Sequence, residues 1–339
     1  MIKKVTVMVI ALTLLILALL PLRRVPDNGP EQTLTRVTFR MNWKLTAPHA
    51  VYLLGKDLGF YKEEGIDLEI LEGNGSVTTG QLIGNKSDTF GLADAAALIP
   101  IMAKGLPIKA VAMVTPTSAL AVIARADRGV QTMKDLEGKT IAVTAGDSIT
   151  QIWPAVVAAN NLNKSRIKLV YVDAAAKIPT TLEGRTDALM GAAGDQSFIL
   201  RDKGVPVVDL IFADYGVNIL NLGIFVHEDL IKENPDLIRR FLRATKKSHE
   251  ALEPNYAKAL RLLINIKKEI KPDLLKKQAD SYYSRMKSPN SPGADMLYNV
   301  PGDWEMTVEI MKKYRNLEGE INAEDFYTND FLPQARVAE

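Results

Sequence analysis

The sequence predicts an α/β protein made of two Rossmann-like lobes that are joined by a hinge of two chain crossings. Short apolar runs of strand type alternate with helical stretches along most of the chain, which is typical of sheets covered by helices. The apolar run Leu222–His227 follows a complete second α/β unit, so we expect the chain to return there to the first lobe. Together with a first crossing near Ala121–Arg125, this return gives a hinge of two strands.

Composition indicates a globular chain that is long enough to bury a substantial core. The sequence has 339 residues, of which 47% are hydrophobic and 24% are charged. Four cations and no acids lie among residues 1–24, so the formal net charge of +2 for the whole chain leaves −2 for the remainder. The sequence has no basic stripe with interleaved aromatic residues, and nucleic acid is therefore not an expected partner.

The absence of cysteine excludes several kinds of chemistry. With no Cys in the sequence there is no disulfide framework, no thiolate nucleophile and no Cys-based metal site. The three histidines, His49, His227 and His249, are too few and too far apart in the sequence to indicate zinc. No nucleophile and base occur in a recognisable constellation, so we expect no catalytic residue, no metal and no cofactor.

Residues 1–24 are predicted to be a signal peptide or an N-terminal membrane anchor. Lys3 and Lys4 precede an apolar run of about 18 residues, as in a secretory signal. Pro21 makes the expected cleavage site poor, which leaves an uncleaved anchor open. In both cases we expect the folded part to lie outside the cytoplasmic membrane.

The first lobe opens with a strand–helix–strand unit. Alternating apolar and polar residues predict a strand at Arg36–Asn42, and Pro48 ends any continuation of that strand. A helix from His49 to about residue 58 ends at Gly59, which suits a left-handed C-terminal cap. The apolar run Ile66–Leu71 is a second strand, and the unit has the length of a parallel right-handed crossover.

The remaining strands follow the same alternation. They are expected at Asp88–Leu92, Pro107–Thr115, Leu120–Arg125, Thr140–Val143, Lys168–Val172, Gly184–Met190, Val205–Phe212 and Leu222–His227. We assign residues 36–124 to the first part of lobe one, 125–222 to lobe two, and 223–333 to the return to lobe one with the C-terminal helices. An amphipathic helix from Pro235 to about residue 252 is the longest of these helices.

Two loops rich in Gly, Ser and Thr each lead into a helix, at Gly73–Thr79 and Thr144–Thr150. Free backbone N–H groups and the positive end of the helix dipole can bind anions or carbonyl oxygens at such loops. The hydroxyl groups are equally suited to capping their own helices. Parallel sheets bind ligands at the carboxyl ends of their strands, where both loops are expected.

Carboxylate and aromatic side chains are expected at the same edge. Asp94 and Asp195 each follow a strand and can accept hydrogen bonds from a ligand or from their own loops. Trp43, Trp153 and Tyr215 offer faces for stacking, although Trp153 precedes Pro154 in the first turn of a helix, where core packing is favoured. The candidate ligand-binding residues are Asn42, Trp43, His49, Gly75, Ser76, Asp94, Thr144, Gly146, Asp147, Ser148, Asp195 and Tyr215.

The opening of the folded part carries a family resemblance. A strand that ends in Trp43, a loop with His49, and the stretch GFYKEEGIDLEI resemble the opening of ABC-importer substrate-binding proteins for nitrate, taurine or other sulfonates, and thiamine-type pyrimidines. The stretches YGVNILNLGIFV, EDLIKENPDLIRRFLRAT and EDFYTNDFLP extend this resemblance over roughly Val37 to Pro333. The last of them is more similar to the ending of pyrimidine- and riboflavin-precursor binders.

The resemblance implies the type II periplasmic binding protein fold, periplasmic localisation, and a permease and an ATPase of an ABC importer as partners. It also implies a monomer that needs no cofactor. We therefore expect an extracytoplasmic solute-binding protein that captures a small heteroaromatic ligand when its two lobes close. A further hypothesis for the function is an anchored sensor, in which an uncleaved N-terminal helix keeps the two lobes at the membrane.

Trp43 and Asp94 are expected to hold that ligand, with Thr144–Ser148 closing from lobe two. No Arg stands at the corresponding loop positions, which disfavours the alternative of a nitrate, sulfonate or taurine site. A second alternative is a pyrimidine-synthase-like enzyme of the same fold. The resemblance implies that such enzymes bind pyridoxal phosphate on Lys and consume a His, at the position of His49, but they lack an export signal and carry a Cys-rich motif.

Overall fold

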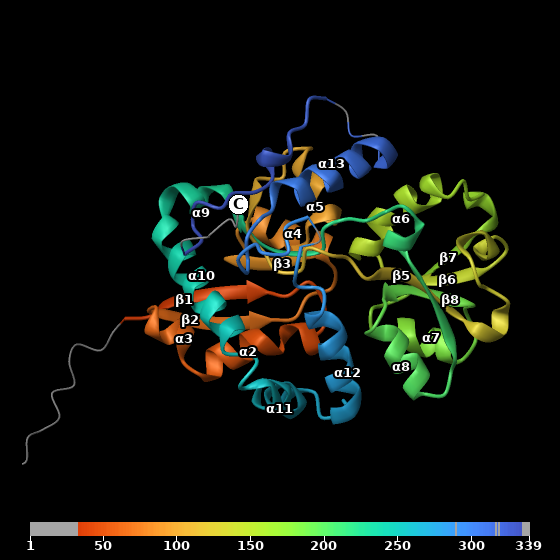
Figure 1. Ribbon diagram of the computed structural model, residues 1–339, viewed down its shortest axis with the longest axis horizontal. Helices are drawn as coiled ribbons and strands as arrows, with labels where there is room; N and C mark the ends of the chain where they lie inside the picture. The colour runs from red at the N-terminus through yellow and green to blue at the C-terminus, as the bar shows by residue number, and fades with distance from the viewer. Residues whose placement is uncertain (1–32, 289, 316, 318, 334–339) are drawn as a thin grey trace, which may run out of the picture. The chain divides into compact units, whose positions relative to one another are not determined.

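The computed structural model describes residues 33–288, 290–315, 317 and 319–333 (Figure 1). The predicted signal peptide or anchor at residues 1–24 lies outside the described residues. Within the part of the chain that is described, no helix is both long and apolar enough to cross a membrane. The described residues from 34 onward belong to one compact unit.

Five strands form the first sheet, in the order β2-β1-β3-β10-β4. β1 runs parallel to both β2 and β3, whereas β10 runs antiparallel to β3 and β4. The strands are β1 Thr35–Arg40, β2 Ile66–Leu71, β3 Phe90–Asp94, β4 Ile108–Met113 and β10 Leu222–His227.

The second sheet repeats this arrangement, in the order β7-β6-β8-β5-β9. β6 is parallel to β7 and β8, and β5 is antiparallel to β8 and β9. The strands are β5 Leu120–Arg125, β6 Thr140–Val143, β7 Lys168–Tyr171, β8 Ala188–Ala192 and β9 Val207–Ile211. The predicted fold class, an α/β protein with two lobes and two crossings, is confirmed.

Helices connect the strands and continue after β10. They are α2 Ala50–Asp57, α3 Phe60–Glu63, α4 Ser76–Gly84, α5 Ala95–Met102, α6 Ser148–Ala159, α7 Lys177–Leu182, α8 Gln196–Asp202, α9 Glu228–Glu233, α10 Pro235–Glu250, α11 Tyr256–Ile266, α12 Pro272–Tyr283 and α13 Pro301–Arg315.

One strand belongs to the other sheet from the one expected. The prediction that Leu120–Arg125 closes the first lobe and makes a crossing is wrong, because β5 is hydrogen-bonded between β8 and β9. The chain instead crosses at residues 114–119 and 216–221, so β5 and β10 each lie inside a sheet. A short apolar strand that is buried on both faces carries no sign of which sheet it will join.

An aromatic cluster joins α10 to the first sheet. The rings of Phe90 and Phe241 are stacked with centroids 3.8 Å apart, and Phe39 meets Phe241 edge-on at 5.1 Å. Each such pair adds about 0.5–1.5 kcal/mol beyond the burial of its area. The predicted apolar face of this helix is confirmed, since all its members are buried: Leu237, Ile238, Phe241, Leu242, Thr245 and Leu252.

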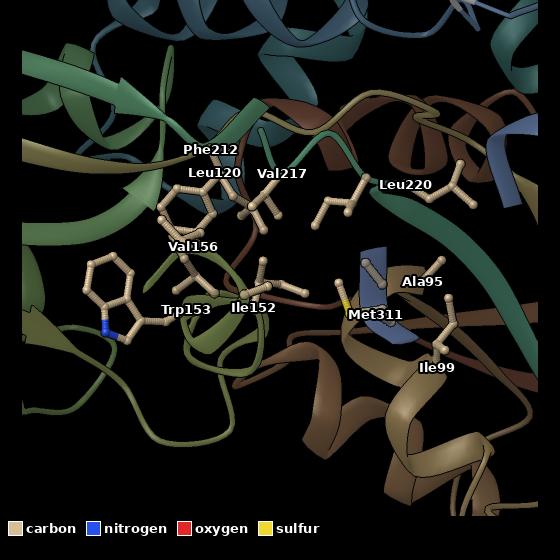
Figure 2. Packing of buried hydrophobic residues seen from close by; sticks show 14 of the residues in the cluster. Ala95, Ile99, Leu120, Ile152, Trp153, Val156, Phe212, Val217, Leu220 and Met311 are labelled. Atoms are coloured by element: carbon tan, nitrogen blue, oxygen red, sulfur yellow. The ribbon is translucent and has the colours of Figure 1, made fainter. Parts of the chain in front are cut away.

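Helices α5, α6 and α13 meet in what we call the apolar junction, defined by Ala95, Ile99, Ile152 and Met311 (Figure 2). α5 follows a strand of the first sheet and α6 a strand of the second, and α13 packs against both. Trp153 belongs to the same cluster and is 2% exposed, so its role is core packing.

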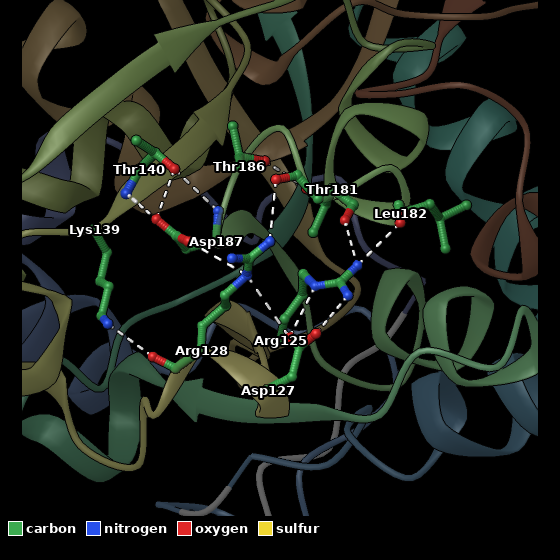
Figure 3. A network of polar contacts seen from close by, with 10 residues as sticks. Arg125, Asp127, Arg128, Lys139, Thr140, Thr181, Leu182, Thr186 and Asp187 are labelled. Atoms are coloured by element: carbon green, nitrogen blue, oxygen red, sulfur yellow. Dashed lines mark hydrogen bonds and ion pairs between the residues drawn. The ribbon is translucent and has the colours of Figure 1, made fainter.

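A polar network connects residues at the end of β5 with residues at the starts of β6 and β8 (Figure 3). Arg125 pairs with Asp127 at 2.7 Å and donates to two backbone carbonyls at the end of α7. Asp187 accepts hydrogen bonds from both the backbone N–H and the hydroxyl of Thr140, each at 2.8 Å. Leu120, at the other end of β5, pairs with Ala192 of β8 and lines a pocket. The polar network therefore lies at the strand ends opposite that pocket.

Candidate functional site

A pocket of about 110 Å³ lies where β3 and β8 end and β5 begins. Elements of both sheets and of the C-terminal helices supply its walls. The lining residues are Asn42, Trp43, Thr46, Pro48, His49, Gly75, Ser76, Asp94, Ala119, Leu120, Asp147, Ser148, Ile149, Lys177, Gly191, Ala192, Gly194, Asp195, Gln196, Asn221, Leu222, Gln278, Tyr282 and Arg285.

Nine of the twelve residues that the sequence singled out line this pocket, and Thr144, Gly146 and Tyr215 do not. Thr144 is buried, and its hydroxyl has no hydrogen-bond partner among the described residues. Tyr215 follows β9, an edge strand two places from β8, and its ring packs against the cluster that contains Trp153. Tyr215 therefore lies outside this pocket, apart from the other predicted stacking residue, Trp43.

Backbone hydrogen bonds hold the loop after β1 against the loop before α4, and both loops line the pocket. The N–H of Gly73 donates to the carbonyl of Trp43 at 3.0 Å, and the N–H of Gly75 donates to that of Asn42 at 2.9 Å. A Cβ on Gly75 would lie 2.2 Å from the carbonyl oxygen of Gly146, and Gly75 has φ +123°. Only glycine permits this approach of the two predicted loops.

His49 is a neutral hydrogen-bond donor in the pocket wall. Its Nδ1 accepts from the backbone N–H of Thr46 at 3.0 Å, so the ring proton resides on Nε2, which lies 3.1 Å from Oδ1 of Asn42. Burial lowers the pKa of His49 to about 4. The imidazole therefore fixes the orientation of the Asn42 amide and leaves its NH₂ group for other partners.

Asp94 has partners on both oxygens. It is 3% exposed, and it accepts hydrogen bonds from the hydroxyl of Ser76 at 2.6 Å and from the amide of Asn221 at 2.7 Å. Burial raises the pKa of Asp94, while the hydrogen bonds from Ser76 and Ser148 lower it. Since Asn221 belongs to the second crossing, Asp94 ties that crossing to the end of β3.

Lys177 is a functional candidate that the sequence did not reveal. It is 1% exposed, and its Nζ lies 2.8 Å from Oδ2 of Asp147, which also caps α6 by accepting from the N–H of Ile149. The same Nζ lies 4.8 Å from the ring centroid of Trp43, within range of a cation–π interaction. One face of Trp43 is thus covered by a charge from the second half of the molecule.

Helix α12 supplies another wall of the pocket, which was not predicted from the sequence. Asp195 accepts a hydrogen bond from the amide of Gln278 at 2.7 Å, and burial raises its pKa to about 6 although Lys177 and Arg285 both act to lower it. Gln278, Tyr282 and Arg285 all line the pocket. Their spacing of four and three residues is that of one helix face, and this was the signal available in the sequence.

Arg285 brings a guanidinium to the pocket, although no Arg stands at the strand-end loop positions that the sequence indicated. The residue comes from just after α12, far along the chain from the strand-end loops, so a search of those loops could not find it. Its Nη1 donates to the hydroxyl of Ser281 at 3.0 Å, and burial lowers its pKa.

The geometry of the two sheets and the pocket defines a class of protein. Two sheets of matching topology, two crossings and a pocket at the facing strand ends make up the periplasmic binding protein fold. The alkanesulfonate-binding protein SsuA from Xanthomonas axonopodis pv. citri, solved bound to MOPS, has this fold. It aligns with a TM-score of 0.67 at 14% identity, over 88% of this chain and 99% of that chain.

The family follows from the sequence comparison. The family described as NMT1/THI5 like matches residues 46–257, and the chain belongs to it. The Saccharomyces cerevisiae 4-amino-5-hydroxymethyl-2-methylpyrimidine phosphate synthase THI5 is 25% identical over 322 residues, which cover 88% of each chain. The formylaminopyrimidine-binding protein of Halalkalibacterium halodurans is 24% identical over 327 residues, covering 93% of this chain and 97% of the relative.

Proposed function

We propose that this protein is the solute-binding component of an ABC importer and captures a small planar nitrogen heterocycle in the pocket. The observation that carries the proposal is the origin of the pocket walls. Residues from both sheets line one small cavity, and in the described part of the chain only two segments, at residues 114–119 and 216–221, connect the sheets directly. Closure of the two halves over a ligand would bury most of the ligand's surface, as binding proteins with hinges do.

The side chains of the pocket suit a flat ring with polar edges. Trp43 offers a stacking face, and the amide group of Asn42 offers donors. Asp195 accepts a hydrogen bond through Oδ1 from Gln278, and its Oδ2 accepts none from the described residues. We assign to Asp195 the hydrogen bond with a ring N–H or amino group, and to Asp94 the support of the loops around it.

The relatives favour a pyrimidine or a similar ring as the ligand, because two of the names given above contain one. Transport also accounts for the apolar run before residue 24, which suits export to the periplasm. On this proposal the protein acts as a monomer outside the cytoplasmic membrane. Its partners are the permease and the ATPase of the importer, and it carries no catalytic residue, metal or cofactor.

A pyrimidine synthase is the second candidate, because a relative of that name spans most of the chain. The pocket residues do not fit pyridoxal phosphate. Lys177 is the one lysine among the described lining residues, and an aldimine there would leave the carboxylate of Asp147 without its partner. His49 is held by Thr46 and Asn42. A pyrimidine product formed after addition of pyridoxal phosphate would overturn this judgement.

The test combines identification of the ligand with calorimetry. Small molecules released by denaturing the purified protein are identified by mass spectrometry, and we expect a planar nitrogen heterocycle at one equivalent. Titration of that heterocycle into Trp43→Ala should show binding weakened about tenfold or more, through loss of stacking and burial. Tyr171→Ala, at an aromatic residue that is 64% exposed on β7, is the matched control and should bind normally.

A released sulfonate or nitrate in place of a heterocycle would overturn the proposed ligand class. Release of no small molecule, together with a failure of pyrimidines, sulfonates and nitrate to bind, would overturn the solute-binding function itself.

A further inference from the structure

We propose that Arg285 and Asp195 form a paired subsite that selects ligands with an N–H group beside a carbonyl, as in a ring lactam or a ring-borne amide. This inference rests on the proposed function and names the class of heterocycle that the pocket takes. Both residues line the pocket, and each contributes to the electrostatic environment of the other. The guanidinium would donate to the carbonyl oxygen, and the carboxylate would accept from the adjacent N–H.

Arg285 is anchored in a way that leaves most of its donors free. Its backbone carbonyl accepts a hydrogen bond from the hydroxyl of Thr117 at 3.0 Å, and its Nη1 donates to Ser281 at 3.0 Å. A guanidinium has five N–H donors in a planar fork and stays protonated in proteins. Among the described residues, no carboxylate oxygen lies within 4 Å of the Arg285 guanidinium. The guanidinium therefore forms no ion pair with a side chain of this part of the chain.

The other charges of the pocket are already satisfied locally. Lys177 is paired with Asp147, and Asp94 accepts hydrogen bonds from neutral groups. Arg285 is the remaining cation, and it is partly removed from water, which lowers its pKa. A charged group in that situation gains more from an acceptor than an exposed one does, because it has already lost part of its hydration.

The loop before Asp195 lies directly against the segment that carries Arg285. A Cβ on Gly194, which has φ +79°, would lie 2.0 Å from the hydroxyl of Ser281 and 3.9 Å from Nη1 of Arg285. Gln278, one helical turn before Ser281 in α12, donates to Oδ1 of Asp195. The guanidinium and the carboxylate therefore border the same part of the pocket, where one could donate to the C=O and the other accept from the N–H of an amide edge.

The experiment measures the affinity of a matched pair of pyrimidines by calorimetry. Cytosine has a ring carbonyl beside an N–H, and 2,4-diaminopyrimidine has an amino group in place of that carbonyl. At a pH where both are neutral, the unmodified protein should bind cytosine more tightly. Arg285→Gln should weaken cytosine about tenfold or more, as expected for a hydrogen bond to a charged group, and change 2,4-diaminopyrimidine less than about threefold.

Two further variants make the outcome specific. Arg285→Lys keeps the charge but loses the planar fork, so its loss for cytosine should be intermediate, and it replaces Arg285→Gln if that variant fails to fold. Arg261→Gln changes an exposed residue of α11 in the same way and should bind both probes normally.

Equal effects of Arg285→Gln on the two pyrimidines, or no effect on either, would overturn the subsite and leave the proposed function standing. If the unmodified protein binds taurine but binds none of cytosine, 2,4-diaminopyrimidine and uracil, the proposed ligand class fails and the subsite fails with it.

Discussion

The two halves of this protein meet in two regions of opposite character. At the apolar junction, Ala95, Ile99, Ile152 and Met311 bring α5, α6 and α13 together without polar contacts among these side chains (Figure 2). At the pocket, the contacts between the halves are polar, such as the hydrogen bond from Gln278 to Asp195.

This difference indicates which side can open. Buried apolar surface stabilises a contact by about 25 cal/mol per Å² and needs no ligand. A typical hydrogen bond contributes only about 0.5–1.5 kcal/mol, because water replaces the partner when the contact breaks. We therefore expect the apolar junction to stay closed in solution while the pocket side opens and closes around a ligand.

The largest effect is expected from breaking the buried ion pair of the pocket. Lys177→Met leaves the Asp147 carboxylate without its partner, which should lower the free energy of unfolding by about 3–5 kcal/mol in chemical denaturation. Lys62→Met, at an exposed lysine of α3, should change it little. Adding Asp147→Asn to Lys177→Met removes the unpaired charge while an amide oxygen can still cap α6, so it should recover much of the loss. A failure to recover would mean that packing of Lys177 matters more than its charge.

A somewhat smaller loss is expected at the apolar junction. Met311 is 0% exposed in α13, and Met311→Ala should lower the free energy of unfolding by about 2–4 kcal/mol through lost burial and a residual cavity. Met296→Ala, at a methionine that is 38% exposed, is the control. A cost no greater than that of the control would contradict the role of α13 in holding the two halves together.

The smallest expected effect is the contribution of one pocket residue, Asp195, to the pH dependence of stability. Burial raises the pKa of Asp195 from 3.8 to about 6, so the folded protein holds this proton more tightly than the unfolded chain does. The stabilisation is present below about pH 4 and is lost as the pH rises through 6. His49, whose pKa is lowered to about 4, acts in the opposite direction and is the same in any variant of Asp195.

Asp195→Asn should therefore gain stability relative to the unmodified protein as the pH is raised from 4 to 7, when unfolding is followed by denaturant titration at several pH values. A difference between the two proteins that is constant over this range would show that folding does not raise the pKa of Asp195.

Much of the pocket could be predicted from the sequence because strand-end loops have a fixed place in parallel sheets. That rule located Asn42, Trp43, Asp94, Asp147 and Asp195. It also singled out Tyr215, which lies outside the pocket, because the rule does not say which strand ends at the centre of a sheet and which at its edge.

The remainder depended on contacts between distant segments. Arg285 reaches the pocket from just after α12, and Lys177 lies in a stretch with no motif, so only the packed structure brings them to Asp195 and Trp43. The sheet that β5 joins was hidden for a related reason, because its residues are buried on both faces and would fit either sheet.

The central claim is that a ligand closes the pocket side while the apolar junction stays fixed. The chain has no Cys, so pairs of cysteines can be introduced and spin-labelled without background. One pair, Asn74→Cys with Ala175→Cys, places labels at exposed residues on opposite sides of the pocket, near Trp43 and Lys177. The other, Lys104→Cys with Ala158→Cys, reports on α5 and α6 beside the apolar junction.

The measurement is the distance distribution of each pair by pulsed electron paramagnetic resonance, with and without the heterocycle released from the protein. The account predicts that the pocket pair becomes closer and more narrowly distributed when the ligand is added, while the junction pair is unchanged. A pocket pair that does not respond to a bound ligand, or a junction pair that moves as much as the pocket pair, would contradict it.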